Sequence, residues 1–202
     1  MSDGAVLSLP PLADSHAPPA AAALFARARS EMKLIPNMYR RMAHAPALLE
    51  TYMDGYARFR RESGLGAAEQ EVVFLAISRE NGCAYCLAAH SFVADTMSGV
   101  PRAVTDAIRD DAPVPDARLG VLARFTRVLV STRGRPTEED VRAFTAAGFT
   151  EVQVLYLILA VAVKTISNYT NHVCDTEVDS VFKAREWRVF KIVQALREKL
   201  GV

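Results

Sequence analysis

Apolar residues recur every three or four positions along most of this chain, which is the spacing of one face of an α-helix. A clear example follows Pro46, a residue that suits the first turn of a helix because it has no N–H to leave unpaired. Its apolar stripe consists of Leu48, Leu49, Tyr52, Tyr56 and Phe59. Neither a hairpin between alternating runs nor a strand–helix–strand pattern occurs, so the sequence predicts an all-α fold.

Residues typical of helix ends divide this pattern into elements. Thr137 with Asp140 and Thr150 with Gln153 are typical of capped helix starts. Asn81–Gly82 is typical of a helix end, because both residues tolerate a left-handed backbone. Together these signals predict helices over residues 20–30, 46–59, 67–80, 83–97, 102–110, 119–130, 137–148, 150–172 and 189–200.

Two of the predicted helices are unusually apolar. Residues 72–77 are apolar on every side, so we expect this segment to be buried. Residues 152–166 are rich in β-branched side chains, but a strand of that length would be unusual. We therefore expect a long helix, whose apolar run 154–163 also packs against another subunit.

Length and composition fit one globular domain. The chain has 202 residues, of which 50% are hydrophobic and 23% are charged. The first nineteen residues contain four prolines and little periodicity, which predicts a loose N-terminal arm over 1–19. The remainder, 20–202, is predicted to form a single all-helical domain.

Charge and targeting signals exclude several classes of function. The formal net charge is +1, whereas nucleic-acid and polybasic membrane surfaces need concentrated positive charge. No signal peptide is recognisable at the start. The longest apolar run, 154–163, is too short to cross a bilayer as a helix. We expect a cytoplasmic protein with neither a nucleic-acid nor a membrane partner.

The candidate chemistry lies between residues 71 and 90. Cys83 and Cys86 follow the predicted helix end directly, so Cys83 falls at a helix N-terminus, where partial positive charge favours a thiolate. His90 lies one turn beyond Cys86 and could accept a thiol proton. Two cysteines three residues apart can also form a disulfide. This combination is typical of a peroxide-reactive or disulfide-exchanging centre.

Two glutamates could assist the histidine. Glu80 lies near the helix end beside Arg79, and we interpret it as solvated. Glu71 adjoins the apolar run, where a buried carboxyl with a raised pKa could relay protons to an imidazole. We therefore favour Glu71.

Other interpretations remain open for these side chains. The cysteines could be buried small hydrophobes, or zinc ligands together with His90 and His172. Asn168 and His172 end the long apolar helix and could line the same pocket. Cys174 is interpreted as a spectator thiol, and the arginines at 58, 60 and 61 as a solvated helix face.

The stretch from Glu71 through Cys83-x-x-Cys86 to His90 resembles the core motif of the alkylhydroperoxidase D / carboxymuconolactone decarboxylase superfamily, especially its peroxidase-related branch. The resemblance covers about residues 35–172. It implies an oligomeric, all-helical protein with thiol peroxidase activity or a role in recycling a peroxiredoxin. It also implies that Cys86 attacks peroxide, that Cys83 is the more exposed, resolving cysteine, and that His90 and Glu71 relay protons.

One position departs from the family pattern. Well-studied members have a second histidine between the cysteines, where this chain has Tyr85, a poor base near neutral pH. This change affects the efficiency of the relay and the choice of partner. The lactone decarboxylases of the superfamily generally lack the cysteine pair, which makes decarboxylation the less favoured inheritance.

The resulting hypothesis is a cysteine-dependent peroxidase or dithiol oxidoreductase. Cys86 would become a sulfenic acid, and Cys83 would condense with it to a disulfide that an external thiol system reduces. The expected partners are a small hydroperoxide and either a thiol reductant or a peroxiredoxin-type protein. No metal, flavin or haem is expected, and the homo-oligomer would be a dimer, trimer or hexamer. The alternatives are disulfide exchange without peroxide chemistry, a cofactor-free lactone decarboxylase, and a redox sensor.

Overall fold

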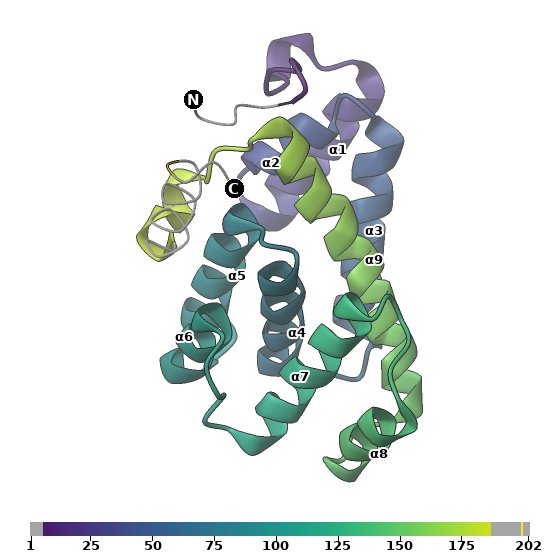
Figure 1. Ribbon diagram of the computed structural model, residues 1–202. Helices are drawn as coiled ribbons and strands as arrows, with labels where there is room; N and C mark the ends of the chain where they lie inside the picture. Colours follow the sequence, from purple (N-terminus) through teal and green to yellow (C-terminus); the bar gives the residue numbers. More distant parts are fainter. Residues whose placement is uncertain (1–5, 187–198, 200–202) are drawn as a thin grey trace.

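The structure is a computed structural model that describes residues 6–186 and Lys199 (Figure 1). The α-helices are α1 (Pro19–Met32), α2 (Asn37–Met42), α3 (Pro46–Glu62), α4 (Ala67–Glu80), α5 (Ala84–Thr96), α6 (Arg102–Asp110), α7 (Ala117–Ser131), α8 (Glu138–Ala146) and α9 (Glu151–Cys174). Short 3₁₀-helices cover Asp14–His16 and Ser180–Arg185. The described part of the chain contains no strand, which confirms the all-α prediction.

The predicted capping signals lie at real helix ends. Thr137 accepts a hydrogen bond from the Asp140 amide at the start of α8, and Thr150 does the same for Gln153 at the start of α9. The short helix α2 was not predicted, because six residues are too few to show a helical period. The predicted helix over 189–200 lies outside the described residues.

Two apolar clusters form the core. The first surrounds α4, which contacts α5, α6, α7 and α9. The second joins α1, α2 and α3 to the beginning of α5 and includes Cys83 and Cys86. Cys86 belongs to the second cluster and the next residue, Leu87, to the first, so the cysteine segment lies where the two clusters meet.

Helix α9 runs along the molecule beside α3 and α4 (Figure 1). By length and composition alone it could cross a membrane, since its most apolar 18-residue window has a mean hydropathy of 1.4. The ten-residue run noted in the sequence therefore understates its apolar length. About a third of that window is buried inside the fold, whereas Val152, Leu155 and Ile158 are exposed.

The described part of the N-terminal arm is attached to the helices by hydrogen bonds. The Leu7 amide donates to the Val173 carbonyl at 3.0 Å, and the Leu12 amide donates to the Arg40 carbonyl at 3.1 Å. His44 lies 2.7 Å from the Pro10 carbonyl oxygen. Residues 7–12 thus lie along α2 and the end of α9.

Helices α3 and α9 approach closely at Gly55. A Cβ atom at this position would lie 2.8 Å from Cγ2 of Val163, a buried β-branched side chain with little freedom to move. Alanine favours helices over glycine by about 1 kcal/mol, but overpacking costs about 1–3 kcal/mol. We expect Gly55→Ala to lower the free energy of unfolding by up to about 2 kcal/mol in urea denaturation.

Gly120 provides the matched control in α7, because its added Cβ would meet Val114 at an ordinary 3.5 Å. Gly120→Ala should raise the free energy of unfolding by about 0.5–1 kcal/mol. An equal gain from Gly55→Ala would contradict the close packing of α3 on α9.

Candidate active site

A helix-ending motif places Cys83 at the beginning of α5. Gly82 adopts a left-handed φ of 69°, its amide donates to the Arg79 carbonyl, and the Cys83 amide donates to the Ser78 carbonyl. These two bonds form the Schellman motif that closes α4. Cys83 is also the N-cap residue of α5, so one tight turn brings the end of α4 to the first cysteine.

Cys86 lies in the first turn of α5 and faces α9. Its Sγ is 3.8 Å from Ser167 Oγ, and Asn171 donates from Nδ2 at 3.4 Å. The same Asn171 amide lies 3.8 Å from the Cys83 Sγ, so it contacts both sulfur atoms. Both cysteines are free thiols in this structure.

The two sulfurs are equally enclosed. Cys83 is 1% exposed and Cys86 is 2% exposed. The expectation that Cys83 is the more exposed cysteine is therefore wrong for this structure. The cause is that the turn after Gly82 places Cys83 in the second apolar cluster, where the Asn171 amide of α9 contacts its sulfur.

Glu71 lies at the centre of a buried polar cluster formed by α3, α4 and α5. Its Oε2 accepts a hydrogen bond from His90 Nδ1 at 2.9 Å, and its Oε1 accepts one from Arg60. The His90 ring also packs on Phe74, with 4.8 Å between ring centroids. Glu71 thus fixes the orientation of His90 through one ring nitrogen.

The second acid lies away from this cluster. Glu80 accepts a hydrogen bond from Arg127 at 3.1 Å on a half-exposed part of α4. The structure therefore brings Glu71, and not Glu80, to the histidine.

Arg60 is not a solvated residue, contrary to our interpretation of the arginine cluster. Its side chain is 21% exposed, against 64% for Arg58 and 63% for Arg61. The guanidinium binds Glu71 and lies 4.8 Å from the ring centroid of Tyr56. Pattern reasoning missed it because all three arginines share one short charged run.

Lys164 is a second site residue that we did not predict. It is 0% exposed, and apart from Glu151 it is the only Lys, Arg, Asp or Glu of α9. Its Nζ has no hydrogen-bond partner among the described residues. The sequence does contain a signal for Lys164, namely a single charged residue directly after a ten-residue apolar run.

The ionisation of Glu71 differs from the expectation of a raised pKa. Burial raises the pKa of this carboxyl, but His90 and Arg60 outweigh burial and lower the pKa below its usual value. Burial and the charge of Lys164 lower the pKa of His90. Glu71 is therefore an anion that orients a neutral imidazole at neutral pH.

The surroundings shift the pKa values of the two cysteines in opposite directions. Burial and the neighbouring Cys86 raise the pKa of the Cys83 thiol. Burial also opposes ionisation of Cys86, but the Cys83 thiol, Lys164 and His90 outweigh it and lower the pKa of Cys86 well below its usual value. The partial charge of the helix N-terminus favours ionisation of Cys83, whereas the complete surroundings in the fold favour ionisation of Cys86 over Cys83.

The remaining candidate residues lie around this pair. The Tyr85 hydroxyl donates to Asp179, and burial raises the pKa of the phenol. Asn168 accepts a hydrogen bond from Asn81 at 2.9 Å, whereas His172 is exposed. Neither Asn168 nor His172 lines the pocket that Cys86 faces, and Asn171 contacts the sulfurs in their place.

The zinc alternative lacks a ligand set. Within residues 6–186 and Lys199, no three Cys, His, Asp or Glu side chains are grouped so that they could hold a metal ion.

Cys86, His90 and Lys164 line one small cavity of about 120 Å³. Its walls are mainly aromatic and sulfur-containing side chains, namely Tyr39, Tyr52, Tyr56, Tyr85, Met32 and Met38. The cavity therefore offers the Cys86 sulfur, an imidazole and a lysine side chain to a small, largely apolar molecule.

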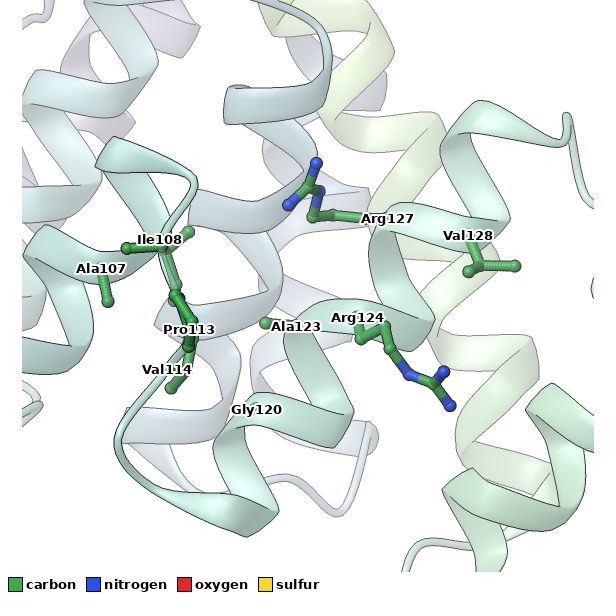
Figure 2. Close-up of a pocket in the computed structure, with 10 residues that line it drawn as sticks. Ala107, Ile108, Pro113, Val114, Gly120, Ala123, Arg124, Arg127 and Val128 are labelled. Atoms are coloured by element: carbon green, nitrogen blue, oxygen red, sulfur yellow. The ribbon is translucent and has the colours of Figure 1, made fainter.

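A larger cavity of about 420 Å³ lies between α6 and α7 (Figure 2). Arg124 and Arg127 border it, and its other lining residues, which include Ile108, Pro113 and Val128, are apolar. It contains no nucleophile or general base, so size does not identify the reactive site in this protein.

Replacing Glu71 tests the buried cluster. Glu71→Gln keeps the shape but removes the charge that His90 and Arg60 bind, so we expect the free energy of unfolding at pH 7 to fall by about 1.5–3 kcal/mol. Because the folded pKa of Glu71 is lowered, its stabilisation is complete above the ordinary value of 4.5 and is lost as the pH falls below it. The variant should lose less stability than the wild type between neutral and acidic pH.

Glu80→Gln is the matched control on the same helix, and it should cost at most about 1 kcal/mol because its ion pair is partly exposed. Equal losses from both variants, in urea denaturation at several pH values, would contradict the central role of Glu71.

Comparison with solved structures shows the same fold in other proteins. An uncharacterised peroxidase-related protein with an alkylhydroperoxidase core from Ralstonia eutropha JMP134 has a TM-score of 0.76 at 20% identity, covering 86% of this chain and 93% of its own. A peroxidase-related protein from Silicibacter sp. TM1040 has a TM-score of 0.74 at 19% identity, covering 92% and 97%. The debrominase Bmp8, as a cysteine-to-alanine variant with bound 2,3,4-tribromopyrrole, has a TM-score of 0.72 at 15% identity, covering 89% and 95%.

Sequence comparison gives a family for the segment that carries the site. No curated protein sequence matches the chain. Residues 46–117, which include Glu71, both cysteines of the pair and His90, match the carboxymuconolactone decarboxylase family. This segment is therefore similar to that family, and the solved structures add that the chain shares the fold of alkylhydroperoxidase-like, peroxidase-related proteins.

Proposed function

We propose that the protein is a cysteine-dependent peroxidase that reduces small hydroperoxides. The observation that carries this proposal is the asymmetry of the cysteine pair: Cys86 has a lowered pKa in a small apolar cavity, and Cys83 beside it has a raised pKa. A thiolate is the form that attacks an O–O bond, and a neighbouring thiol is the form that resolves the product.

The first chemical step takes place at Cys86. Its sulfur attacks one peroxide oxygen, the O–O bond breaks, and the sulfur becomes a sulfenic acid while an alkoxide leaves. The alkoxide takes one proton and becomes an alcohol. His90 lies in the same cavity and is oriented by Glu71, so it is positioned to pass a proton from solvent to the alkoxide.

The second step closes the pair. The Cys83 thiol attacks the sulfenic sulfur, a disulfide forms, and the hydroxyl leaves with the thiol proton as water. An external thiol reductant then has to supply two thiols to return the disulfide to the reduced state.

The burial of both sulfurs helps to distinguish a peroxidase from a disulfide-exchange protein. A protein partner cannot reach either cysteine directly in this conformation, which favours a small peroxide as the first reactant over direct disulfide exchange. A lactone decarboxylase would use His90 and Glu71 without the cysteines, so its activity would survive the loss of both.

A second candidate reaction is reductive dehalogenation of a small aromatic compound. The aromatic walls of the cavity, together with the fold shared with a debrominase bound to a brominated pyrrole, favour it. The same two cysteines would supply the electrons: carbon–halogen is replaced by carbon–hydrogen, halide is released, and the pair becomes a disulfide. Release of bromide from a bromopyrrole, compared with consumption of hydroperoxide, separates the two reactions.

We also propose a cytoplasmic homo-oligomer. The chain has three cysteines, too few for a disulfide scaffold at this length, which suits a reducing compartment. The exposed apolar side chains of α9, Val152, Leu155 and Ile158, support contact with a second copy of the chain.

The roles of the two cysteines can be separated by substitution. Cys86→Ser should reduce turnover of an organic hydroperoxide to the rate without enzyme, because no other thiolate faces the cavity. Cys83→Ser should react once and stop, with Cys86 held as a sulfenic acid. Consumption of hydroperoxide and intact mass after treatment with a sulfenic-acid reagent measure the two results.

Cys174→Ser is the matched control, since burial raises the pKa of this thiol and it lies outside the cavity. It should leave turnover unchanged. Full activity in Cys86→Ser would show that the assigned nucleophile is wrong.

A further inference from the structure

One face of α9 presents three buried polar side chains to Cys86. Lys164, Ser167 and Asn171 follow one another at spacings of three and four residues, so they occupy successive turns of the same helix face. Their exposed fractions are 0%, 0% and 5%. Ser167 and Asn171 contact the Cys86 sulfur directly, and Lys164 lines the same cavity one turn earlier.

Lys164 lacks the partner that a buried ammonium requires. Its Nζ makes no hydrogen bond within the part of the chain that the structure describes, and a nearby side chain is the Phe74 ring, with 5.7 Å between Nζ and the ring centroid. An unpaired buried charge is strongly destabilising. Glu71, the buried carboxylate of the cluster, is already bound by Arg60 and His90.

We propose that Lys164 is the cation that holds Cys86 as a thiolate, and that it thereby favours the reduced form of the Cys83–Cys86 pair. The buried charges then balance in two pairs: Arg60 with Glu71, and Lys164 with Cys86. Lys164 acts through Cys86 and is a positioning residue. This proposal rests on the same cysteine pair as the proposed function, but it predicts properties of the pair that do not depend on any substrate.

The other titratable groups near Cys86 do not supply a competing cation. Burial raises the pKa of Tyr52 and Tyr56 on α3 and of Tyr85 on α5, so these phenols are neutral. Burial lowers the pKa of His90, and His172 is exposed and lies outside the cavity. Cys83 is the neutral thiol that faces the thiolate.

The charge of Lys164 affects the equilibrium between the reduced and oxidised forms of the Cys83–Cys86 pair. In the reduced pair, the Cys86 sulfur carries a negative charge that Lys164 balances. When a disulfide such as oxidised glutathione takes the two electrons, both protein sulfurs become neutral and two glutathione thiols form, one with the proton of Cys83 and one with a proton from solvent. Lys164 then loses its anion, so oxidation is disfavoured while the lysine is charged.

The test compares the thiolate titration of Cys86 in the wild type with that in Lys164→Met and Lys164→Gln. The signal is the ultraviolet absorbance of the thiolate in reduced protein, minus that of Cys86→Ser. The wild-type midpoint should lie below the ordinary value of about 8.5, and both variants should raise it by about one to three pH units. Glutamine keeps a donor without the charge, so it separates charge from hydrogen bonding.

Equilibration with glutathione at pH 7 provides the second readout. The reduced pair should become at least about tenfold less favoured in both Lys164 variants, which corresponds to about 30 mV. Thermal unfolding of the reduced variants verifies that they are folded. Lys183→Met, at an exposed lysine paired with Glu177, should change neither the midpoint nor the equilibrium.

The outcomes distinguish this proposal from the peroxidase proposal. Shifted titrations with no reaction between wild-type protein and hydroperoxide would support the role of Lys164 and refute the peroxidase function. Unchanged midpoints in folded Lys164 variants would overturn the role of Lys164. If neither variant folds, a wild-type Cys86 midpoint at or above the ordinary value would overturn it equally.

Discussion

The burial of charge at the meeting point of α3, α4, α5 and α9 constrains the whole centre of this protein. Glu71 has no exposed surface, and a carboxylate in that position is tolerated only when cations and hydrogen-bond donors surround it. Arg60 from α3 and His90 from α5 meet this requirement from two sides. The same contacts orient the imidazole toward the cavity that Cys86 faces, so stability and chemistry depend on one cluster.

Local sequence features were sufficient to predict most of the helices and the cysteine segment. Capping residues, the Asn81–Gly82 helix end and the spacing of Cys83, Cys86 and His90 act over one or two helical turns. These features can therefore be located in the sequence without knowledge of how distant elements pack. The helix end also explains why Cys83 begins α5, because the left-handed Gly82 turns the chain there.

The side chains that complete the site come from elsewhere in the chain and could not be predicted in this way. Arg60, Lys164 and Asn171 belong to α3 and α9, and periodicity shows which face of a helix is apolar but not which residues it meets. The ionisation of Glu71 illustrates the difference. Burial alone favours a raised pKa, whereas Arg60 and His90, whose arrangement appears only in the folded protein, lower it.

The central claim is that Cys83 and Cys86 form a peroxide-reactive pair. The most direct measurement is a thiol count with intact mass on metal-free, reduced wild-type protein, before and after one equivalent of an organic hydroperoxide. We predict rapid loss of two thiols and two hydrogens, with the new disulfide mapped to Cys83 and Cys86. Persistence of all thiols in the presence of peroxide, while a disulfide reagent still closes the pair, would contradict the peroxidase account.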